Sequence, residues 1–407
     1  MDKSISFEKI KLLSDKYVMS TYRQSLCFEK GMGAYLYGSN GKAFLDFTSG
    51  IAVTNLGHCH PEIIEVIKYQ SDNLMHVSNL FFNKIQPQLA EQLVACSGLP
   101  NAKCFFCNSG AEANEGMIKL ARLWGSNDDK YEIITMKQSF HGRTLATLTA
   151  TGQEKVKKGF GPLPEGFVYA DYNDLNSVKS LINSKTVAVM VESIQGEGGV
   201  IPADKTFLRE LRKLCSEHNI LLLCDEVQAG MGRTGKWFGF QHADIKPDII
   251  SSAKGLGNGF PIGALIAKDE LSNVFQPGHH ATTFGGNPLS SAVSLKVIEI
   301  IKKNNLLRNA EIVGNHLKTK LKESLKVFDW VDDVRGLGLM LGIVLNIEAI
   351  HLQKKLEENE LLAIATAGNI LRLLPPMIIT IDEANKAVDI IIKSCEQINS
   401  EMKKLKN

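Results

Sequence analysis

Two residues suited to acid–base and covalent chemistry stand at the ends of short apolar runs. Asp225 ends the run 220–224, and Lys254 follows the run 248–252 and precedes a flexible, glycine-rich stretch at 255–259. A carboxylate at the end of an apolar strand is costly without a cation, so Asp225 predicts either a protonated pyridine nitrogen or an arginine beside it. Most lysines are solvated surface residues, but a desolvated lysine can lose its proton and form a Schiff base. The small, apolar flanks of Lys254 favour that second interpretation.

Three more polar segments follow apolar runs in the same way. They are 109–111 (Ser-Gly-Ala), 140–143 (Phe-His-Gly-Arg) and 195–199 (Gln-Gly-Glu-Gly-Gly). In an open parallel sheet, ligands bind beyond the carboxyl ends of the strands. Together with the segments of Asp225 and Lys254, they predict a single crevice at that edge of the sheet.

The segment at Ser109 has the features of a helix start. Ser109, with Glu112 three residues later, has the pattern of a capping box. At such an N-terminus the N–H groups of Gly110 and Ala111 suit a phosphate, with help from the helix dipole. A capped helix without any ligand is the commoner case, so the motif by itself favours that alternative.

The elements that must position these residues follow an α/β pattern. Apolar runs alternate with amphipathic stretches between about residues 100 and 270, which predicts an α/β fold with a parallel sheet. Continuously apolar runs are typical of strands that are covered on both faces. The strands we expect are 103–108, 132–136, 186–192, 220–224, 248–252 and 263–267.

Beyond residue 290 the pattern becomes mainly helical, with further strands expected at 334–345 and 370–374. We expect a large domain at 55–295, which contains all of the central strands. The segments 1–54 and 296–407 would together form a smaller second domain.

The composition is that of an ordinary globular protein. The 407 residues, 44% of them hydrophobic, can bury a large core, and a net charge of +2 gives no basic surface of the kind that nucleic-acid binding needs. The eight cysteines do not form a secreted disulfide framework, and no apolar run approaches the roughly 20 residues that span a bilayer. The first residues contain no apolar core of a signal peptide. We therefore expect a cytoplasmic protein with no membrane partner.

Two other classes of ligand are disfavoured. The glycines at 255–259 do not have the spacing of a dinucleotide-binding fingerprint. His58 and His60, like Cys104 and Cys107, resemble metal ligands only superficially, because no second cluster has zinc-ligand spacing. We expect neither NAD nor a bound metal.

Several longer motifs are specific enough to indicate a family. They are 108–115 (NSGAEANE), 195–199 (QGEGG), 225–235 (DEVQAGMGRTG), 253–257 (AKGLG) and 283–288 (TFGGNP). Over nearly its whole length the chain resembles the class III aminotransferases of pyridoxal 5′-phosphate (PLP) fold type I, and most closely the acetylornithine aminotransferases. This resemblance implies PLP as cofactor and a mostly parallel central sheet with flanking helices plus a smaller α/β domain.

The resemblance also implies which residues contact the PLP ring. Lys254 would form the internal Schiff base and then move the proton between the substrate carbon and the cofactor. Asp225 would keep the pyridine nitrogen protonated, so that the ring can accept electrons. Gln228 would lie near the phenolic oxygen of the ring, and Phe140 would stack on its face.

By the same resemblance, phosphate binding involves a second copy of the chain. The backbone N–H groups of Gly110 and Ala111 would bind the phosphate. Thr283 would reach the same phosphate from the partner subunit. The resemblance therefore implies a homodimer with shared active sites.

Two arginines and a glutamate are implied to select the substrates. Arg372 would pair bidentately with the α-carboxylate of glutamate or 2-oxoglutarate. Arg143 would bind the distal carboxylate of these acids, or the α-carboxylate of an ornithine derivative whose far amine reacts. Glu197 would neutralise Arg372 while the ω-amine donor is bound and release it for glutamate. Taken alone, either arginine could instead belong to a surface ion pair.

The reaction implied is transamination between N2-acetyl-L-ornithine and 2-oxoglutarate, which gives N-acetylglutamate 5-semialdehyde and glutamate in arginine biosynthesis by a ping-pong Schiff-base mechanism. A pocket lined by Phe81 and Asn83 would accept the acetyl end and reject a second ammonium group. Ornithine, N-succinylornithine and N-succinyl-diaminopimelate are the alternative amino donors. A binding protein that has kept the fold without catalysis is disfavoured, because Lys254, Asp225 and both arginines are present.

Overall fold

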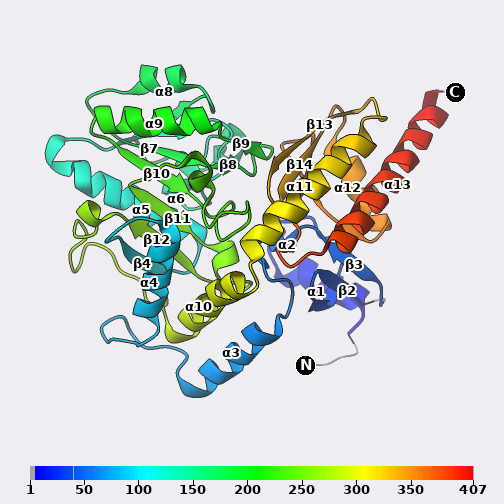
Figure 1. Cartoon of the computed structure of the whole chain (residues 1–407), viewed down its shortest axis with the longest axis horizontal. Helices are drawn as coiled ribbons and strands as arrows, with labels where there is room; N and C mark the ends of the chain where they lie inside the picture. Colours follow the sequence, from blue (N-terminus) through cyan, green and yellow to red (C-terminus); the bar gives the residue numbers. More distant parts are fainter. Residues whose placement is uncertain (1–4, 40, 407) are drawn as a thin grey trace.

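The middle of the chain folds into a seven-stranded sheet with helices on both faces (Figure 1). The structure, a computed structural model, describes residues 5–39 and 41–406. In spatial order the strands are β4 (Lys103–Cys107), β12 (Gly263–Ala267), β11 (Ile249–Ser252), β10 (Leu221–Asp225), β7 (Thr186–Glu192), β5 (Glu132–Met136) and β6 (Phe167–Ala170). All the predicted central strands are present, and β6 is an additional edge strand that was not predicted.

The sheet is mostly parallel, with one strand reversed. β10 pairs in parallel with both β7 and β11, whereas β12 runs antiparallel to β11 and to β4. Only residues 253–262 connect β11 to β12. This connection is shorter than the dozen or more residues that a parallel crossover needs, so the chain turns back beside β11. The α/β fold is confirmed, and the expected parallel pairing fails only at β12.

Successive side chains of β10 enter different hydrophobic layers, as a strand covered on both faces requires. Leu223 belongs to the layer formed with α5 (Gly110–Gly125). Its neighbour Leu222 belongs to the layer formed with α9 (Lys205–Glu217). Because helices cover both faces, a ligand can approach the sheet only at the ends of its strands.

A second sheet, with the order β13-β14-β17-β16, lies in the C-terminal third. The elements of this region are β13 (Val331–Leu337), β14 (Met340–Leu345), β16 (Ile364–Thr366), β17 (Ile370–Leu373), α11 (Leu306–Leu325), α12 (Ala349–Glu358) and α13 (Ile381–Lys406). The run expected as one strand at 334–345 is instead a hairpin that turns at Gly338, whose φ is +54°. A Cβ atom at Gly338 would lie 2.6 Å from the backbone of Thr234, so the turn packs tightly against the loop after β10.

A third sheet joins the N-terminal segment to the C-terminal third (Figure 1). Three consecutive strands pair antiparallel, and β15 adds to the last of them in parallel. The strands are β1 (Phe28–Met32), β2 (Tyr35–Gly38), β3 (Ala43–Asp46) and β15 (Leu361–Leu362). Segments more than 300 residues apart in the sequence are therefore hydrogen-bonded neighbours.

This pairing agrees with a small domain built from 1–54 and 296–407 beside a large one at 55–295. The division itself stays a prediction. Residues 1–4, 40 and 407 of the small domain lie outside the described residues.

The remaining elements connect and cover the three sheets. They are α1 (Phe7–Tyr17), α2 (Ser49–Ala52), α3 (Pro61–Asn73), α4 (Gln86–Ser97), α6 (Leu145–Ala150), α7 (Glu154–Lys157), α8 (Leu175–Leu181), α10 (Pro288–Lys303), β8 (Ile194–Gln195), β9 (Ile201–Pro202), and the 3₁₀ helices η1 (Ser126–Asp128), η2 (Gly239–Ala243), η3 (Lys254–Leu256) and η4 (Asp269–Leu271). Across the described residues, none of the helices combines the length and the apolar character that a membrane span requires.

A buried arginine ties the separate segments together near the strand ends. Arg233, in the loop after β10, is 0% exposed and donates hydrogen bonds to Asn55 Oδ1 and to the carbonyl oxygens of Leu339 and Pro375. These acceptors come from the N-terminal segment, the β13–β14 turn and the segment after β17. Burial lowers the pKa of Arg233 to about 9. The loop after β10 is thereby fixed relative to the segment after β17.

Candidate active site

A pocket of about 390 Å³ lies beyond the carboxyl ends of the parallel strands. All five predicted strand-end segments contribute to its lining, through residues of 108–111, 140–143 and 225–228 and through Glu197 and Lys254. They meet because the parallel strands present their carboxyl ends at the same edge of the sheet. The structure therefore brings these segments together in one place.

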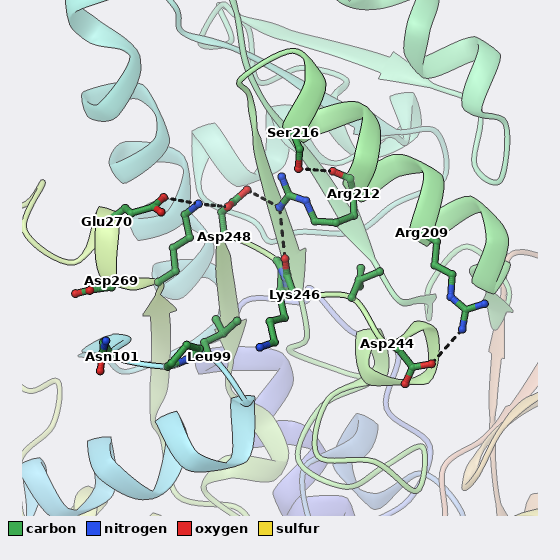
Figure 2. Close-up of a pocket in the computed structure, with 14 residues that line it drawn as sticks. Leu99, Asn101, Arg209, Arg212, Ser216, Asp244, Lys246, Asp248, Asp269 and Glu270 are labelled. Carbon is green, nitrogen blue, oxygen red and sulfur yellow. Dashed lines mark hydrogen bonds and ion pairs between the residues drawn. The ribbon is translucent and has the colours of Figure 1, made fainter.

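A larger pocket, of about 580 Å³, lies at the opposite ends of the strands (Figure 2). Asp248 precedes β11 and Lys268 follows the antiparallel β12, which places both at the amino ends of the parallel strands. Figure 2 shows that charged groups here pair with one another: Arg209 with Asp244, and Arg212 with Asp248. Lys268 also pairs with Asp248. Because these charges already have partners within the protein, the smaller pocket is the stronger candidate.

Lys254 begins η3, two residues after the last residue of β11. Its backbone has a φ of +46°, a left-handed conformation that is uncommon for a residue with a side chain. Burial, followed by the positive charge of Arg372, lowers the pKa of Lys254 to about 8. About a tenth of the amine is then unprotonated at pH 7, as a nucleophile or proton acceptor requires.

The glycines after Lys254 permit close packing. A Cβ atom at Gly255 would lie 2.2 Å from Asn55 Nδ2, and one at Gly257 would lie 2.0 Å from the carbonyl oxygen of Phe260. Both glycines are buried. The stretch that was expected to be flexible is therefore packed against the N-terminal segment, and this packing restricts the backbone of Lys254.

Asp225 is 4% exposed, and hydrogen bonds hold both of its carboxylate oxygens. Oδ2 lies 2.7 Å from the donor Asn114 Nδ2 and 2.8 Å from His141 Nδ1, and Oδ1 accepts from the N–H of Val227 at 3.0 Å. Among the described residues, the basic side chain within ion-pair distance of Asp225 is His141, so the arginine given as one of the two alternatives is not found there. The carboxylate lines the pocket, where a cationic group of a ligand can approach it.

The N-terminus of α5 opens onto the same pocket. Ser109 Oγ accepts from the N–H of Glu112 at 3.2 Å, as predicted. The reciprocal half of the capping box is displaced by one residue, because the Glu112 carboxylate accepts from the N–H of Asn108 at 2.5 Å. Gly110 and Ala111, in the first turn, line the pocket, and their N–H groups have no acceptor within the helix. An anion would find N–H donors and the positive end of the helix dipole here.

Arg372, on β17, is 1% exposed and does not itself line the pocket. Its Nη1 atom donates to Glu197 Oε1 at 2.5 Å and to Gln228 Oε1 at 3.2 Å. Burial alone would raise the pKa of Glu197, but the charge of Arg372 and its hydrogen bond outweigh burial and lower that pKa. At neutral pH the pair is ionised and the buried guanidinium is neutralised.

Arg143 provides a second positive charge at the pocket. Its side chain is exposed, and the guanidinium carbon lies 5.3 Å from the centre of the Phe140 ring. Within the part of the chain that the structure describes, no carboxylate forms an ion pair with Arg143. Its charge is therefore available for the carboxylate of a ligand.

Besides Arg372, three residues with predicted roles lie outside the lining of this pocket. Thr283 is exposed in the loop before α10. Phe81 is 67% exposed, and Asn83 Nδ2 donates to the carbonyl oxygen of Gly286 at 3.2 Å. Phe81 and Asn83 do not line the pocket of their own chain, because their loop lies against 282–287 at the surface, and their role at the acetyl end stays a prediction.

Three buried residues contact the site without having been assigned a role from the sequence: Asn114, His141 and Glu192. Asn114 and His141 bind Asp225, and Glu192 accepts from the N–H of Phe140 at 3.1 Å. Burial, followed by the charge of Asp225, raises the pKa of Glu192 well above its usual range. Glu192 ends the apolar strand β7, so the argument that indicated Asp225 also applies to it. Asn114 and His141 lie in segments that stand out in the sequence, but the spacing between them does not indicate that both contact Asp225.

The chain has extensive similarity to known proteins. Residues 17–395 match the family described as Aminotransferase class-III. The chain is 48% identical to the acetylornithine aminotransferase of Bacillus subtilis, over 91% of this chain and 95% of the relative, and 43% identical to that of Methanocaldococcus jannaschii, over 96% and 98%. The crystal structure of the ornithine aminotransferase from Toxoplasma gondii has the same fold, with a TM-score of 0.94 and 31% identity over 98% of this chain and 97% of that chain.

The pKa of Lys254 should respond in opposite directions to the loss of two charged neighbours. In the cofactor-free enzyme, a reagent that reacts with unprotonated amines should modify Lys254 faster as the pH rises through about 8. Arg372→Met removes a positive charge, so the midpoint should move to higher pH. Glu197→Gln removes a negative charge, so the midpoint should move to lower pH, each shift being about one unit. Peptide mass spectrometry measures the modification, and shifts in the same direction would contradict these roles.

Proposed function

Because the chain belongs to the class-III aminotransferases, which are PLP-dependent enzymes, we propose that it transfers an amino group from N2-acetyl-L-ornithine to 2-oxoglutarate. The products are N-acetylglutamate 5-semialdehyde and glutamate, and the reaction belongs to arginine biosynthesis. Curated relatives at 43–48% identity over more than nine-tenths of the chain carry the name acetylornithine aminotransferase. These names support this donor over ornithine, N-succinylornithine and N-succinyl-diaminopimelate.

The ion pair between Glu197 and Arg372 is the observation that carries the choice of donor. With the buried guanidinium neutralised, Arg143 is the arginine at the pocket that remains available for a carboxylate. A donor with its carboxylate at one end and its reacting amine at the other can bind Arg143 and present that amine to Lys254. N-acetylornithine has this form, and its acetylated α-nitrogen carries no second ammonium group that would have to be desolvated.

The pocket fits PLP in its charge and its polar groups. The buried carboxylate of Asp225 suits a protonated ring nitrogen, and the N-terminus of α5 at Gly110 and Ala111 suits a phosphate. The amine of Lys254, with its lowered pKa, suits an aldehyde. His141 Nε2 is buried and has no hydrogen-bond partner among the described residues, although its ring contacts Asp225. This unpaired polar atom beside Asp225 is compatible with a ligand that adds polar contacts to the pocket.

Each residue near the ring has a distinct task in this proposal. Bound PLP supplies an aromatic ring that accepts electrons from the carbon carrying the amino group. Lys254 Nζ would take the proton from that carbon and return a proton within the same half-reaction. Asp225 would keep a proton on the nitrogen that faces it, which preserves the electron-accepting form of the ring. Phe140 would stack on the ring, and Gln228 would contact its phenolic oxygen.

The second half-reaction requires Glu197 to leave Arg372. 2-Oxoglutarate has two carboxylates, of which one would pair with Arg143 and the other bidentately with Arg372. The side chain of Glu197 is 30% exposed, whereas that of Arg372 is 1% exposed. Glu197 can therefore move into the pocket while remaining partly solvated, and Arg372 can stay where its surroundings hold it.

A comparison of amino donors tests the function. In single turnovers of the PLP form, N-acetylornithine should change the visible absorbance of the lysine-bound cofactor faster than ornithine or N-succinyl-diaminopimelate does. The reason is that ornithine brings a second ammonium group and the succinyl compound a longer acyl end. Lys254→Ala should abolish the reaction with every donor. Faster conversion of ornithine would instead make the protein an ornithine aminotransferase.

Replacing Glu197 should weaken the discrimination between the two amino donors. In Glu197→Ala the guanidinium of Arg372 is no longer neutralised, so the rate ratio of N-acetylornithine to glutamate should fall by about tenfold. Half-reaction rates measured at several concentrations of each donor provide this ratio. Glu358→Ala, which removes an exposed glutamate on α12, serves as the control. A ratio that stays unchanged in Glu197→Ala would exclude the switching role.

We further propose a homodimer that forms through a surface made of 74–86 and 282–287. Asn79 and Asn83 hold these two segments together by hydrogen bonds to the carbonyl oxygens of Gly285 and Gly286. Large apolar side chains are exposed on this surface: Leu74, Met75, Leu80, Phe81, Phe82 and Phe284. Monomeric proteins rarely expose an apolar patch of this kind. Thr283 lies in the same surface, from which it would reach the phosphate site of the partner.

Charge on this surface should dissociate the dimer. Phe81→Asp combined with Phe82→Asp places two carboxylates where apolar side chains would be buried, so the enzyme should become monomeric at micromolar concentration. Light scattering after size-exclusion chromatography measures the mass. Val327→Asp, at an exposed apolar residue after α11, should leave the mass unchanged. A double variant with the same mass as the parent enzyme would place the interface elsewhere.

We propose the cytoplasm as the location of the enzyme. All eight cysteines are free thiols in the structure. Unpaired cysteines are typical of reducing compartments, where disulfides rarely persist.

A further inference from the structure

The segment that carries Glu197 has little means of its own to fix that side chain. Gly196 precedes Glu197, and Gly198 and Gly199 follow it, so neighbouring side chains in the segment provide no packing. Gly199 has a left-handed backbone, with a φ of +113°. The position of Glu197 therefore depends on contacts from other parts of the chain.

One of these contacts comes from Thr366, which is 8% exposed on β16. Its Oγ1 atom donates to the carbonyl oxygen of Glu197 at 2.9 Å and lies 3.5 Å from Glu197 Oε2. The first distance is that of a good hydrogen bond, and the second places the hydroxyl beside the carboxylate oxygen that does not bind Arg372. Thr366 thus holds the backbone at the base of the Glu197 side chain.

The strand that carries Thr366 is the neighbour of the strand that carries Arg372. β16 pairs antiparallel with β17, where Ile364 lies opposite Arg372 and Thr366 lies opposite Ile370. Because this pairing is fixed by backbone hydrogen bonds, the distance between the Thr366 hydroxyl and the Arg372 guanidinium is set by the sheet. Thr366 therefore aligns Glu197 with the cation that Glu197 neutralises.

A second anchor acts on the far side of Glu197. Arg335 Nη2 and Nε donate to the carbonyl oxygen of Gly199 at 2.8 and 3.0 Å. This anchor fixes the end of the glycine-rich segment but lies two residues from Glu197. Thr366 is the described residue whose side-chain hydroxyl contacts both the backbone and the carboxylate of Glu197.

We propose that Thr366 is a positioning residue that sets how firmly Glu197 is held on Arg372, and so determines the balance between the ω-amine donor and the dicarboxylic substrates. This inference rests on the proposed function of the Glu197–Arg372 pair. While the hydroxyl is in place, the closed pair disfavours a second substrate carboxylate. Without it, the carbonyl oxygen of Glu197 loses its donor, and Glu197 leaves Arg372 more readily.

Thr366→Val tests the proposal, because valine keeps the shape of threonine and removes only the hydroxyl. In single turnovers of the holoenzyme, the rate ratio of N-acetylornithine to glutamate should fall by about three- to tenfold, the range that one hydrogen bond of ordinary strength can shift. Thr366→Ser retains the hydroxyl and should keep the ratio of the parent enzyme. An unchanged ratio in Thr366→Val, with N-acetylornithine still the preferred donor, would overturn the inference.

Binding of an unreactive dicarboxylate gives a readout that does not depend on turnover. Glutarate should compete with Glu197 for Arg372, so calorimetry of the holoenzyme should find tighter binding to Thr366→Val than to Thr366→Ser, by the same three- to tenfold. Equal affinities would overturn the inference. They would mean that Glu197 is held on Arg372 equally well with and without the Thr366 hydroxyl.

A double-mutant cycle distinguishes an effect through Glu197 from a general loosening of the site. In a Glu197→Ala background, Thr366→Val should not change the donor ratio any further, because the carboxylate that it positions is absent. An equal additional fall would show that Thr366 acts by another route and would overturn the inference. If Glu197→Ala alone leaves the ratio unchanged, the proposed function of the ion pair fails and the inference fails with it. If Glu197→Ala changes the ratio and Thr366→Val does not, only the inference fails.

Discussion

Arg372 is a cation with almost no contact with water, and the structure depends on the negative charge that Glu197 places against it. A buried charge without a partner would cost several kcal/mol, so this pair constrains both residues to one geometry. The constraint is uneven, because Glu197 is partly exposed and Arg372 is not. The same pair therefore stabilises the fold and leaves one member able to move. In the proposed function, substrate selection follows from that asymmetry, since a second carboxylate would reach Arg372 only when Glu197 moves away from it.

Several carboxyl groups lie close together at the carboxyl ends of the strands, and they differ in their hydrogen bonds and their pKa values. Asp225 is held by Asn114 and His141 and still lines the pocket. Burial raises the pKa of Glu226 to about 7, and its carboxylate oxygens accept hydrogen bonds from backbone N–H groups of η2. Burial and the charge of Asp225 raise the pKa of Glu192, which reduces the repulsion at this edge. Asp225 is thus left as the carboxylate best suited to a cationic ligand.

The site is assembled from segments that are distant in the sequence, and buried polar contacts keep them in register. Arg233 joins the loop after β10 to the N-terminal segment and to the segment after β17, and Asn55 contacts both Arg233 and the carbonyl oxygen of Met231. Gly255 packs directly on Asn55. The loop after β10, the glycines after Lys254 and the segment after β17 are consequently held together by buried contacts.

The sequence by itself determined the α/β class, the central strands and the strand-end segments, because these follow from apolar runs and local motifs, and its resemblance to the class III aminotransferases identified the family and cofactor. Local pattern could not determine the reversal of β12, which depends on the length of one connection, or the partners of Asp225, which lie 84 and 111 residues away. The contact of Thr366 with Glu197 spans 169 residues and exists only because β16 pairs with β17. Such contacts arise from how sheets and loops pack in three dimensions, which cannot be predicted from the spacing of residues along the chain. Only the tertiary structure decided them.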